Sequence, residues 1–260
     1  STVCIPTRFE REDYLMSLLD SILNQTKLPT KILFVSDKDQ LEKKFKIINK
    51  IKNRIKDICL YDFIESNKNG LANARNTGID NCNTEVLFFS DDDDIWHPEK
   101  IEILIKCIQE EGKCLISHYF NIIKKNNSRS MHFRYKPKPN YLMTGFSNFI
   151  GGGSSFCGSL SVFETLRFND YRFSEDWDFW IRALLSEVKI IRIKKSLVSY
   201  RYHSNNLTKN KFSIYLLETK IRFKLFIKLF LILLGSFLGF FYYSSKNLIL
   251  IIFRIIKLVK

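Results

Sequence analysis

Four consecutive aspartates follow a run of four apolar residues in VLFFSDDDDIW, residues 86–96. The apolar run 86–89 is typical of a buried strand, and the aspartates come almost directly after it. Carboxylates in such a place repel one another and are costly to desolvate unless a positive charge compensates them. We therefore interpret the run as a cation site. A solvated acidic turn is the alternative interpretation.

The spacing of the aspartates suggests which ion they would hold. Asp91 and Asp93 are two residues apart, so in extended backbone their side chains point to one side while Asp92 points away. Two carboxylates suit Mn²⁺ or Mg²⁺, which keeps coordination positions open for phosphate oxygens. Arg75, in NKNGLANARNTG, is a second candidate ligand of phosphate. Together these residues predict a site for a nucleotide diphosphate, with Asp94 beyond it in solvent.

A second acidic pair, Glu175 and Asp176 in FSEDWDFWIRAL, precedes an amphipathic helix. Such a pair could supply a general base, or it could simply offset the dipole at an ordinary helix N-terminus. Trp177 and Trp180 lie beside it. We expect Trp180 in the core, whereas Trp177 could stack on a sugar. The run GGGSSF, residues 151–156, could let the backbone approach an acceptor closely, or it could be a flexible loop.

Strands that alternate with helices must position these residues in the first half of the chain. Such alternation predicts an α/β fold with a parallel, doubly wound sheet, whose ligands bind beyond the carboxyl ends of the strands. The aspartate run lies at such an end. After Gly112 the alternation fades. The expected strands are 1–7, 31–37, 58–65 and 85–90, and the expected helices are 11–26, 40–57, 70–82 and 98–112.

The second half is predicted in less detail. We expect strand or hairpin structure over 114–140, a glycine-rich loop leading into a strand over 148–163, a loop and helix over 172–185, and a strand over 189–203. The lysine-rich helix 40–57 is interpreted as a solvated surface, and no nucleic-acid partner is predicted. The six cysteines are scattered without a C-x-x-C pair, which favours reduced thiols in a cytosolic protein. Because an apolar strand begins directly after Ser1, we expect no signal peptide.

Charge and hydropathy divide the chain into a domain, 1–208, and a basic, apolar helical tail, 209–260. The tail carries +9 of the net charge of +14. Residues 229–245 contain no charge, and basic residues stand on both sides, as in helices that lie in an anionic membrane interface. We predict peripheral or monotopic attachment to anionic lipids. One short transmembrane span is the alternative, since 17 residues is the lower limit for crossing a bilayer.

Five motifs, in order, resemble those of the family 2 glycosyltransferases. They are CIPTRFEREDYLMSLLDSILNQT, ILFVSD, NGLANARNTGI, VLFFSDDDDIWHPEKIE and FSEDWDFWIRAL, and the resemblance covers roughly residues 1–205. It implies the GT-A fold, a Rossmann-like, mostly parallel sheet flanked by helices, here with a C-terminal helical, membrane-associated tail. It also implies inverting transfer of a sugar from a nucleotide-diphosphate donor, with UDP as the expected nucleotide.

The resemblance implies a role for each matching position. Asp176 matches the catalytic carboxylate, Asp93 the direct metal ligand, and Asp91 a residue on the ribose or a metal-bound water. Asp37 matches the residue that reads the base, although Ser36, Lys38 and Asp39 depart from the family pattern around it. The other residues matched to the nucleotide-sugar site are Pro6, Thr7, Arg75 and Asp92, with His203 placed near the diphosphate.

The predicted function is transfer to a hydroxyl of a glycan or lipid-linked acceptor, in surface polysaccharide or glycoconjugate synthesis at the cytoplasmic face of the membrane. Two other functions stay open at this point. A nucleotidyltransferase-like, metal-dependent enzyme could use the same aspartates, although it would not require a second acidic site. An inactive, membrane-bound relative is the other, and the altered sequence after Ser36 is its only support.

Overall fold

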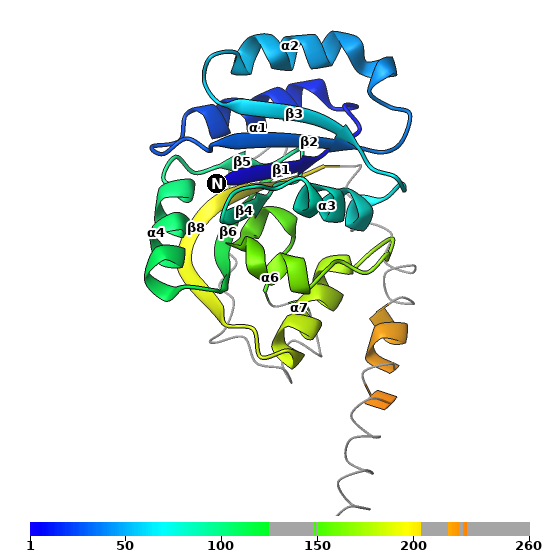
Figure 1. The fold of residues 1–260 in the computed structure, drawn as a ribbon, viewed down its shortest axis with the longest axis vertical. Coiled ribbons are helices and arrows are strands. Elements are labelled where there is room, and N and C mark those ends of the chain that lie inside the picture. The colour runs from blue at the N-terminus through cyan, green and yellow to red at the C-terminus, as the bar shows by residue number, and fades with distance from the viewer. Residues whose placement is uncertain (125–147, 149, 204–217, 224–225, 228–260) are drawn as a thin grey trace, which may run out of the picture. The chain divides into compact units, whose positions relative to one another are not determined.

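The computed structural model describes residues 1–124, 148, 150–203, 218–223 and 226–227 (Figure 1). The chain divides into two compact units, Ser1–Asn210 and Lys211–Lys260. In the first unit the strands are β1 (Thr2–Pro6), β2 (Lys31–Ser36), β3 (Leu60–Glu65), β4 (Val86–Phe89), β5 (Ile95–Trp96), β6 (Leu115–Lys124), β7 (Phe156–Ser159) and β8 (Ile190–Tyr202). The helices are α1 (Glu12–Leu23), α2 (Phe45–Ile55), α3 (Leu71–Asp80), α4 (Lys100–Glu111), α6 (Leu160–Thr165) and α7 (Glu175–Leu185), with 3-10 turns η1 (Glu42–Lys44) and η2 (Gly153–Ser155).

The strands form one sheet in the order β3-β2-β1-β4-β7-β6-β8-β5. The first four are parallel, which confirms the expectation for the first half of the chain. β7 runs antiparallel to both β4 and β6, β8 is parallel to β6, and β5 is antiparallel to β8. The sheet is therefore mixed: its first half is entirely parallel, as expected, and its second half combines the parallel pairing of β6 with β8 and the antiparallel pairings of β7 and β5.

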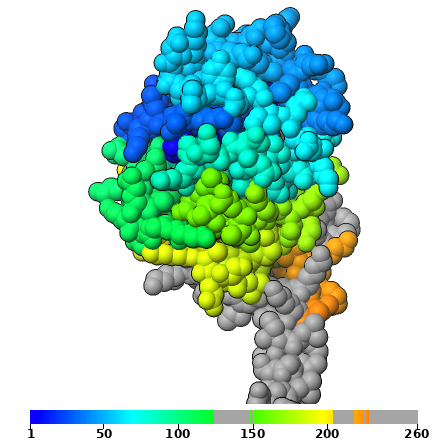
Figure 2. Space-filling model, viewed as in Figure 1, coloured from blue at the N-terminus to red at the C-terminus, as the bar shows by residue number. Residues whose placement is uncertain are grey.

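Helices cover both faces of the sheet because side chains alternate along its central strands. Val3 and Ile5 of β1 belong to the core under α1, α2 and α4. Cys4 belongs to the opposite core, under α3, α6 and α7 (Figure 1). Trp180 lies in that second core, as predicted. On the face drawn in Figure 2, the blue to green N-terminal segments pack directly against the yellow-green segments after residue 150.

Helix α3 packs very close to β1, and this contact fixes the helix that carries Arg75. A Cβ on Gly78 would lie 2.2 Å from the Sγ of Cys4, so only glycine fits there. Because β1, β2 and β4 are parallel and adjacent, their carboxyl ends share one edge of the sheet. The segments after Pro6, Ser36 and Phe89 therefore lie together, as the sequence predicts.

All six cysteines are free thiols, which agrees with the absence of a disulfide pattern. In the second unit, residues 218–223 and 226–227 are helical. Among the described residues, no helix combines the length and the apolar character needed to cross a bilayer. The uncharged stretch 229–245, on which the predicted membrane attachment depends, lies outside the described residues.

Candidate active site

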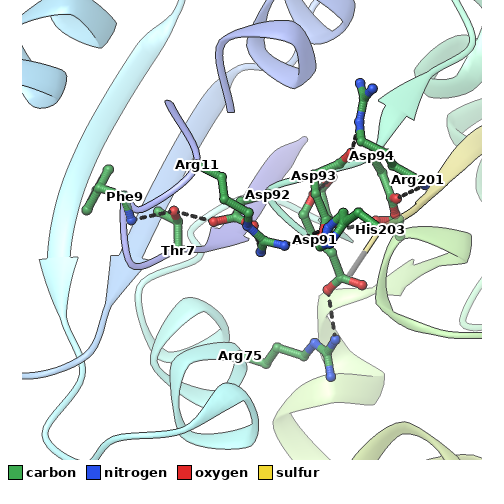
Figure 3. Close-up of polar contacts among 12 residues, drawn as sticks. Thr7, Phe9, Arg11, Arg75, Asp91, Asp92, Asp93, Asp94, Arg201 and His203 are labelled. Atoms are coloured by element: carbon green, nitrogen blue, oxygen red, sulfur yellow. Dashed lines mark hydrogen bonds and ion pairs between the residues drawn. The ribbon is translucent and has the colours of Figure 1, made fainter. Parts of the chain in front are cut away.

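The aspartates after β4 form a turn rather than an extended segment. Arg11 donates from Nη2 to Asp92 Oδ1 at 2.5 Å and from Nη1 to Asp93 Oδ2 at 2.6 Å (Figure 3). Thr7 Oγ1 donates to the other oxygen of Asp92 at 2.7 Å. The prediction that Asp92 points away from Asp93 is therefore wrong, because the turn directs both carboxylates to one guanidinium. His203 Nε2 also contacts Asp93 Oδ2, at 2.9 Å, and so joins this group.

Asp91 takes a different cation, Arg75. The Nη2 of Arg75 lies 3.2 Å from Asp91 Oδ1, and its Nη1 donates to Glu175 Oε1 at 2.5 Å. Arg75 is 1% exposed, so its charge depends on these two carboxylates for compensation. Glu175 is thereby occupied as the ion-pair partner of Arg75. The structure thus connects the acidic turn after β4 to the start of α7.

Asp94 is 1% exposed, so the prediction that it lies in solvent is wrong. Strand β8 covers it, and the backbone N–H of Arg201 donates to Asp94 Oδ1 at 3.0 Å. The Nε of Arg201 donates to the carbonyl oxygen of Asp93 at 2.9 Å (Figure 3). Burial raises the pKa of Asp94 well above its usual value, and the negative charges of Asp91 and Asp93 add to this effect.

Asp176 lies in the first turn of α7. Its Oδ1 accepts a hydrogen bond from the Trp177 N–H at 2.7 Å, and its Oδ2 accepts one from Asn148 Nδ2 at 3.1 Å. Burial, followed by the negative charge of Glu175, raises the pKa of Asp176 to about 7, and Arg75 opposes this shift. A carboxylate with such a pKa can accept a proton near neutral pH.

Two consecutive glycines lie close to the acidic groups, one beside Asp176 and the other beside the Arg75–Asp91 pair. A Cβ on Gly152 would lie 3.4 Å from Asp176 Oδ2. A Cβ on Gly153 would lie 2.3 Å from Arg75 Nη2 and 2.8 Å from Asp91 Oδ1. Since adjacent Cα atoms are about 3.8 Å apart, the two acidic groups line one short glycine segment. The sequence alone left open whether this segment is more than a flexible loop.

Three further residues predicted for the site, Trp177, Pro6 and Asp37, lie in different surroundings. Trp177 is 1% exposed, so stacking on a sugar is contradicted, because α7 is buried along this turn. Pro6 ends β1 and is buried. Asp37 follows β2, where it accepts from Gly70 N at 2.8 Å and from Arg8 Nε at 2.7 Å. This edge is separate from the contacts of the acidic turn.

Sequence reasoning missed Arg11, although a signal for it existed. Arg11 immediately precedes α1, where a positive charge opposes the helix dipole. Such an unfavourable placement indicates a partner elsewhere, here Asp92 and Asp93. Asn148 and Arg201 were also missed, because their partners lie far away in the sequence.

Asp91, Asp93 and His203 are the side chains here that could hold a metal ion. No group of three or more metal-ligating side chains is assembled in the described part of the chain. However, Mg²⁺ and similar ions need only one or two protein carboxylates when phosphate oxygens and water complete the coordination. Imidazole is also a ligand type that transition metals accept. The donor set therefore fits such an ion if Arg11 yields its place beside Asp93.

The fold of this chain resembles that of solved glycosyltransferase structures. The structure of S. aureus TarS 1-349 in complex with UDP-GlcNAc superimposes with a TM-score of 0.64 at 16% identity, covering 80% of this chain and 60% of the TarS 1-349 chain. At that identity the likeness establishes a GT-A-like glycosyltransferase fold. Residues 2–167 match the family described as Glycosyl transferase family 2, and the chain belongs to that family.

Two curated relatives extend the comparison. Glycosyltransferase GlyA of Streptococcus pneumoniae is 28% identical over 80% of this chain, which spans only 31% of that protein. The UDP-Glc:alpha-D-GlcNAc-diphosphoundecaprenol beta-1,3-glucosyltransferase WfaP of Escherichia coli is 26% identical over 92% of this chain and 90% of its own length. The chain is therefore related to known glycosyltransferases, and one of these relatives is named for a lipid-linked acceptor.

Proposed function

We propose that this chain is an inverting glycosyltransferase that moves a sugar from a UDP-sugar to a hydroxyl of a lipid-linked glycan. Membership of family 2 supports the transferase activity. The name of the E. coli relative, which matches over nearly its full length, supports UDP-glucose as the first donor to test and a polyprenyl-diphosphate-linked sugar as the first acceptor.

One observation carries the proposal: a carboxylate able to act as a base, Asp176, lies beside a separate group that contains an arginine, the Arg75–Asp91 pair. Gly152 approaches Asp176, and the adjacent Gly153 approaches Arg75 and Asp91. Sugar transfer needs both functions, because the leaving diphosphate must be stabilised while the attacking hydroxyl loses its proton. Nucleotidyl transfer gives no reason for a base in this second position.

Each residue has a distinct part in the proposed reaction. Asp176 accepts the proton of the attacking hydroxyl, and Asn148 holds one of its oxygens in place. Arg75, a buried cation whose guanidinium Glu175 orients, would supply positive charge close to the diphosphate. A Mn²⁺ or Mg²⁺ ion held by Asp93 with Asp91 or His203 would act as a Lewis acid on the leaving phosphate. Attack opposite the leaving group in a single displacement inverts the anomeric carbon.

The membrane interface is the proposed location of this reaction. A polyprenyl-linked acceptor is confined to the bilayer, so an enzyme attached to the cytoplasmic surface meets it at high local concentration. The tail 209–260, with ten basic residues and one acidic residue, has the charge to bind anionic lipids there.

The test is a transfer assay of the full chain with UDP-sugars, Mn²⁺ and a synthetic polyprenyl-diphosphate-linked N-acetylglucosamine. We expect release of UDP and a product whose new linkage has the anomeric configuration opposite to that of the donor. Release of pyrophosphate would instead identify a nucleotidyltransferase. A folded chain that neither binds nor transfers any of these sugars would be an inactive relative.

A further inference from the structure

Lys100 is a buried cation that the proposed reaction does not use. It is the first residue of α4 and is 0% exposed. Its Nζ donates to the carbonyl oxygen of Ser154 at 2.8 Å and lies 3.5 Å from the centroid of the Trp96 ring. Burial lowers the pKa of Lys100 to about 7, while Cys157, Asp94 and Asp91 act in the opposite direction.

The position of Lys100 on its helix makes this burial informative. Leu104 and Ile108, one and two turns further along, are both buried, so Lys100 begins the apolar stripe of α4. A buried ammonium is destabilising unless its contacts compensate it, and an apolar side chain would be less costly there. Because this charge is costly to bury, we expect it to have a role that an apolar side chain would not fill.

Both contacts of Lys100 lead to the acidic turn. Ser154, held through its carbonyl oxygen, accepts a hydrogen bond at its Oγ from the backbone N–H of Asp91, at 2.8 Å. Trp96, held through its ring, donates from Nε1 to Ser90 Oγ at 2.9 Å. Lys100 is thus connected to Asp91 through Ser154 and to Ser90 through Trp96.

The turn held by Lys100, η2, also approaches the Arg75–Asp91 pair. Ser154 lies in η2 with Gly153, whose absent Cβ leaves room for Arg75 Nη2 and Asp91 Oδ1. A shift of η2 would move Gly153 against Arg75, and it would release the N–H of Asp91. The ammonium of Lys100 therefore supports the geometry of both members of the Arg75–Asp91 pair.

We propose that Lys100 is a positioning residue of the donor site, whose ammonium fixes η2 against residues 90–94 and so sets Asp91 beside Arg75. In naming the donor site, this inference rests on the proposed function. The alternative is that Lys100 only fills space in the core.

The experiment compares Lys100→Met with Lys106→Met in the full chain. Lys106 is an exposed lysine of the same helix, so its variant is the matched control. Three quantities are measured: the midpoint of thermal unfolding, the hydrogen exchange of the segment 90–96, and the Kd for UDP in Mn²⁺. For Lys100→Met we expect exchange of the Asp91 amide and the Kd each to rise about tenfold or more, as when a hydrogen bond to a charged group is lost. Lys106→Met should leave both unchanged.

Other outcomes overturn the inference. If Lys100→Met lowers the unfolding temperature but leaves the exchange and the Kd as in the wild type, Lys100 has only a packing role. If that variant does not fold, Ser154→Ala decides, because it keeps Lys100 and removes only the hydroxyl that reaches Asp91. Unchanged exchange and Kd in Ser154→Ala would contradict the proposal. If the wild type itself does not bind UDP, the proposed function fails, and the exchange of the Asp91 amide still decides the role of Lys100.

Discussion

Arg11 shows how single residues define this site. Its guanidinium is within 2.6 Å of both Asp92 and Asp93, and its side chain is 31% exposed. The two carboxylates thus have a cation from the protein itself. Because Asp93 is also the proposed metal ligand, Arg11 and a divalent cation would compete for it. A metal ion held by Asp93 would then take the place of Arg11 at that carboxylate.

We predict that Arg11→Gln makes the protein more dependent on divalent cations. Without them, the free energy of unfolding should fall by about 1–3 kcal/mol, since two buried carboxylates lose a charged partner. Addition of Mn²⁺ should then raise the unfolding temperature more in the variant than in the wild type. Thermal unfolding with and without Mn²⁺ measures both effects.

Arg8→Gln is the control for this prediction. Arg8 pairs with Asp37 outside the acidic turn, and its side chain is 62% exposed, so little stability should be lost. An equal Mn²⁺ effect in the wild type and Arg11→Gln would contradict the competition between Arg11 and the metal ion.

At this scale the sequence predicts residue types better than their partners. Arg75 and Asp176 were predicted from motifs, and both lie beside the glycine segment. The pairing of Asp92 with Asp93 was not predicted, because the alternation argument assumed extended backbone where the chain turns. Lys100 carries a readable signal, a charge on the apolar stripe of a helix, but its partner Ser154 is 54 residues away.

Among the elements, the segment from Gly151 to Ser155 has the most exacting geometry. Trp180 Nε1 donates to the Gly151 carbonyl oxygen at 3.0 Å, Lys100 holds Ser154, and both neighbouring glycines face functional groups. These contacts come from α7 and α4, so the segment is anchored from two helices. A rigid support of this kind favours a fixed distance between the diphosphate and the base.

We predict that Gly153→Ala weakens binding of UDP about tenfold or more. Its Cβ would lie 2.3 Å from Arg75 Nη2, so the buried guanidinium would have to move away from Asp91. Gly152→Ala is the matched control, because its Cβ would make an ordinary 3.4 Å contact with Asp176 Oδ2. Calorimetric titration with UDP in Mn²⁺ compares them. Equal UDP affinity in both variants would mean that a glycine at position 153 is not required beside the Arg75–Asp91 pair.

Elements whose contacts are close in the sequence were predicted better than elements that pair over long sequence separations. β1 to β4 and α1 to α4 were predicted from local periodicity, because strands and covering helices alternate there, with only the two-residue strand β5 between β4 and α4 missed. The second half depends on pairings that local pattern does not encode. β6 pairs in parallel with β8 although paired residues such as Leu115 and Ile190 are 75 positions apart, and irregular register around Tyr119 interrupts the ladder. For this reason the mixed half of the sheet was expected only as unassigned strands.

For the whole molecule, the uneven charge distribution is the main physical feature. Residues 209–260 hold +9 of the net +14, so residues 1–208 carry only +5. The first compact unit, Ser1–Asn210, contains every residue of the candidate site that the structure describes. Catalysis and membrane attachment are thus predicted to reside in different parts of the chain.

We predict that truncation after Asn210 separates these two properties. The shortened chain should keep UDP binding but no longer sediment with vesicles that contain anionic lipid, because most of the excess charge and the long apolar runs leave together. Vesicles of neutral lipid are the control, and they should bind the full chain more weakly. If the shortened chain unfolds, the tail belongs to the core and the membrane interpretation is wrong.

The two acidic groups have separate functions in the proposed reaction, with Asp176 as base and the acidic turn as donor site. The decisive measurement is kcat and UDP affinity of Asp176→Asn across pH 5–9, beside Asp178→Asn. Asp178 is a buried carboxylate of the same helix that pairs with Arg182, so its variant controls for changes in α7. Because a protonated carboxyl cannot accept a proton, wild-type kcat should rise with pH through the Asp176 pKa of about 7.

Asp176→Asn should lower kcat by about 10² to 10⁴-fold, abolish that rise with pH, and leave the affinity for UDP unchanged. Asp178→Asn should keep the rise. Near-normal kcat in Asp176→Asn would show that another group is the base. Loss of UDP affinity in that variant would show that the two acidic groups do not have separate functions.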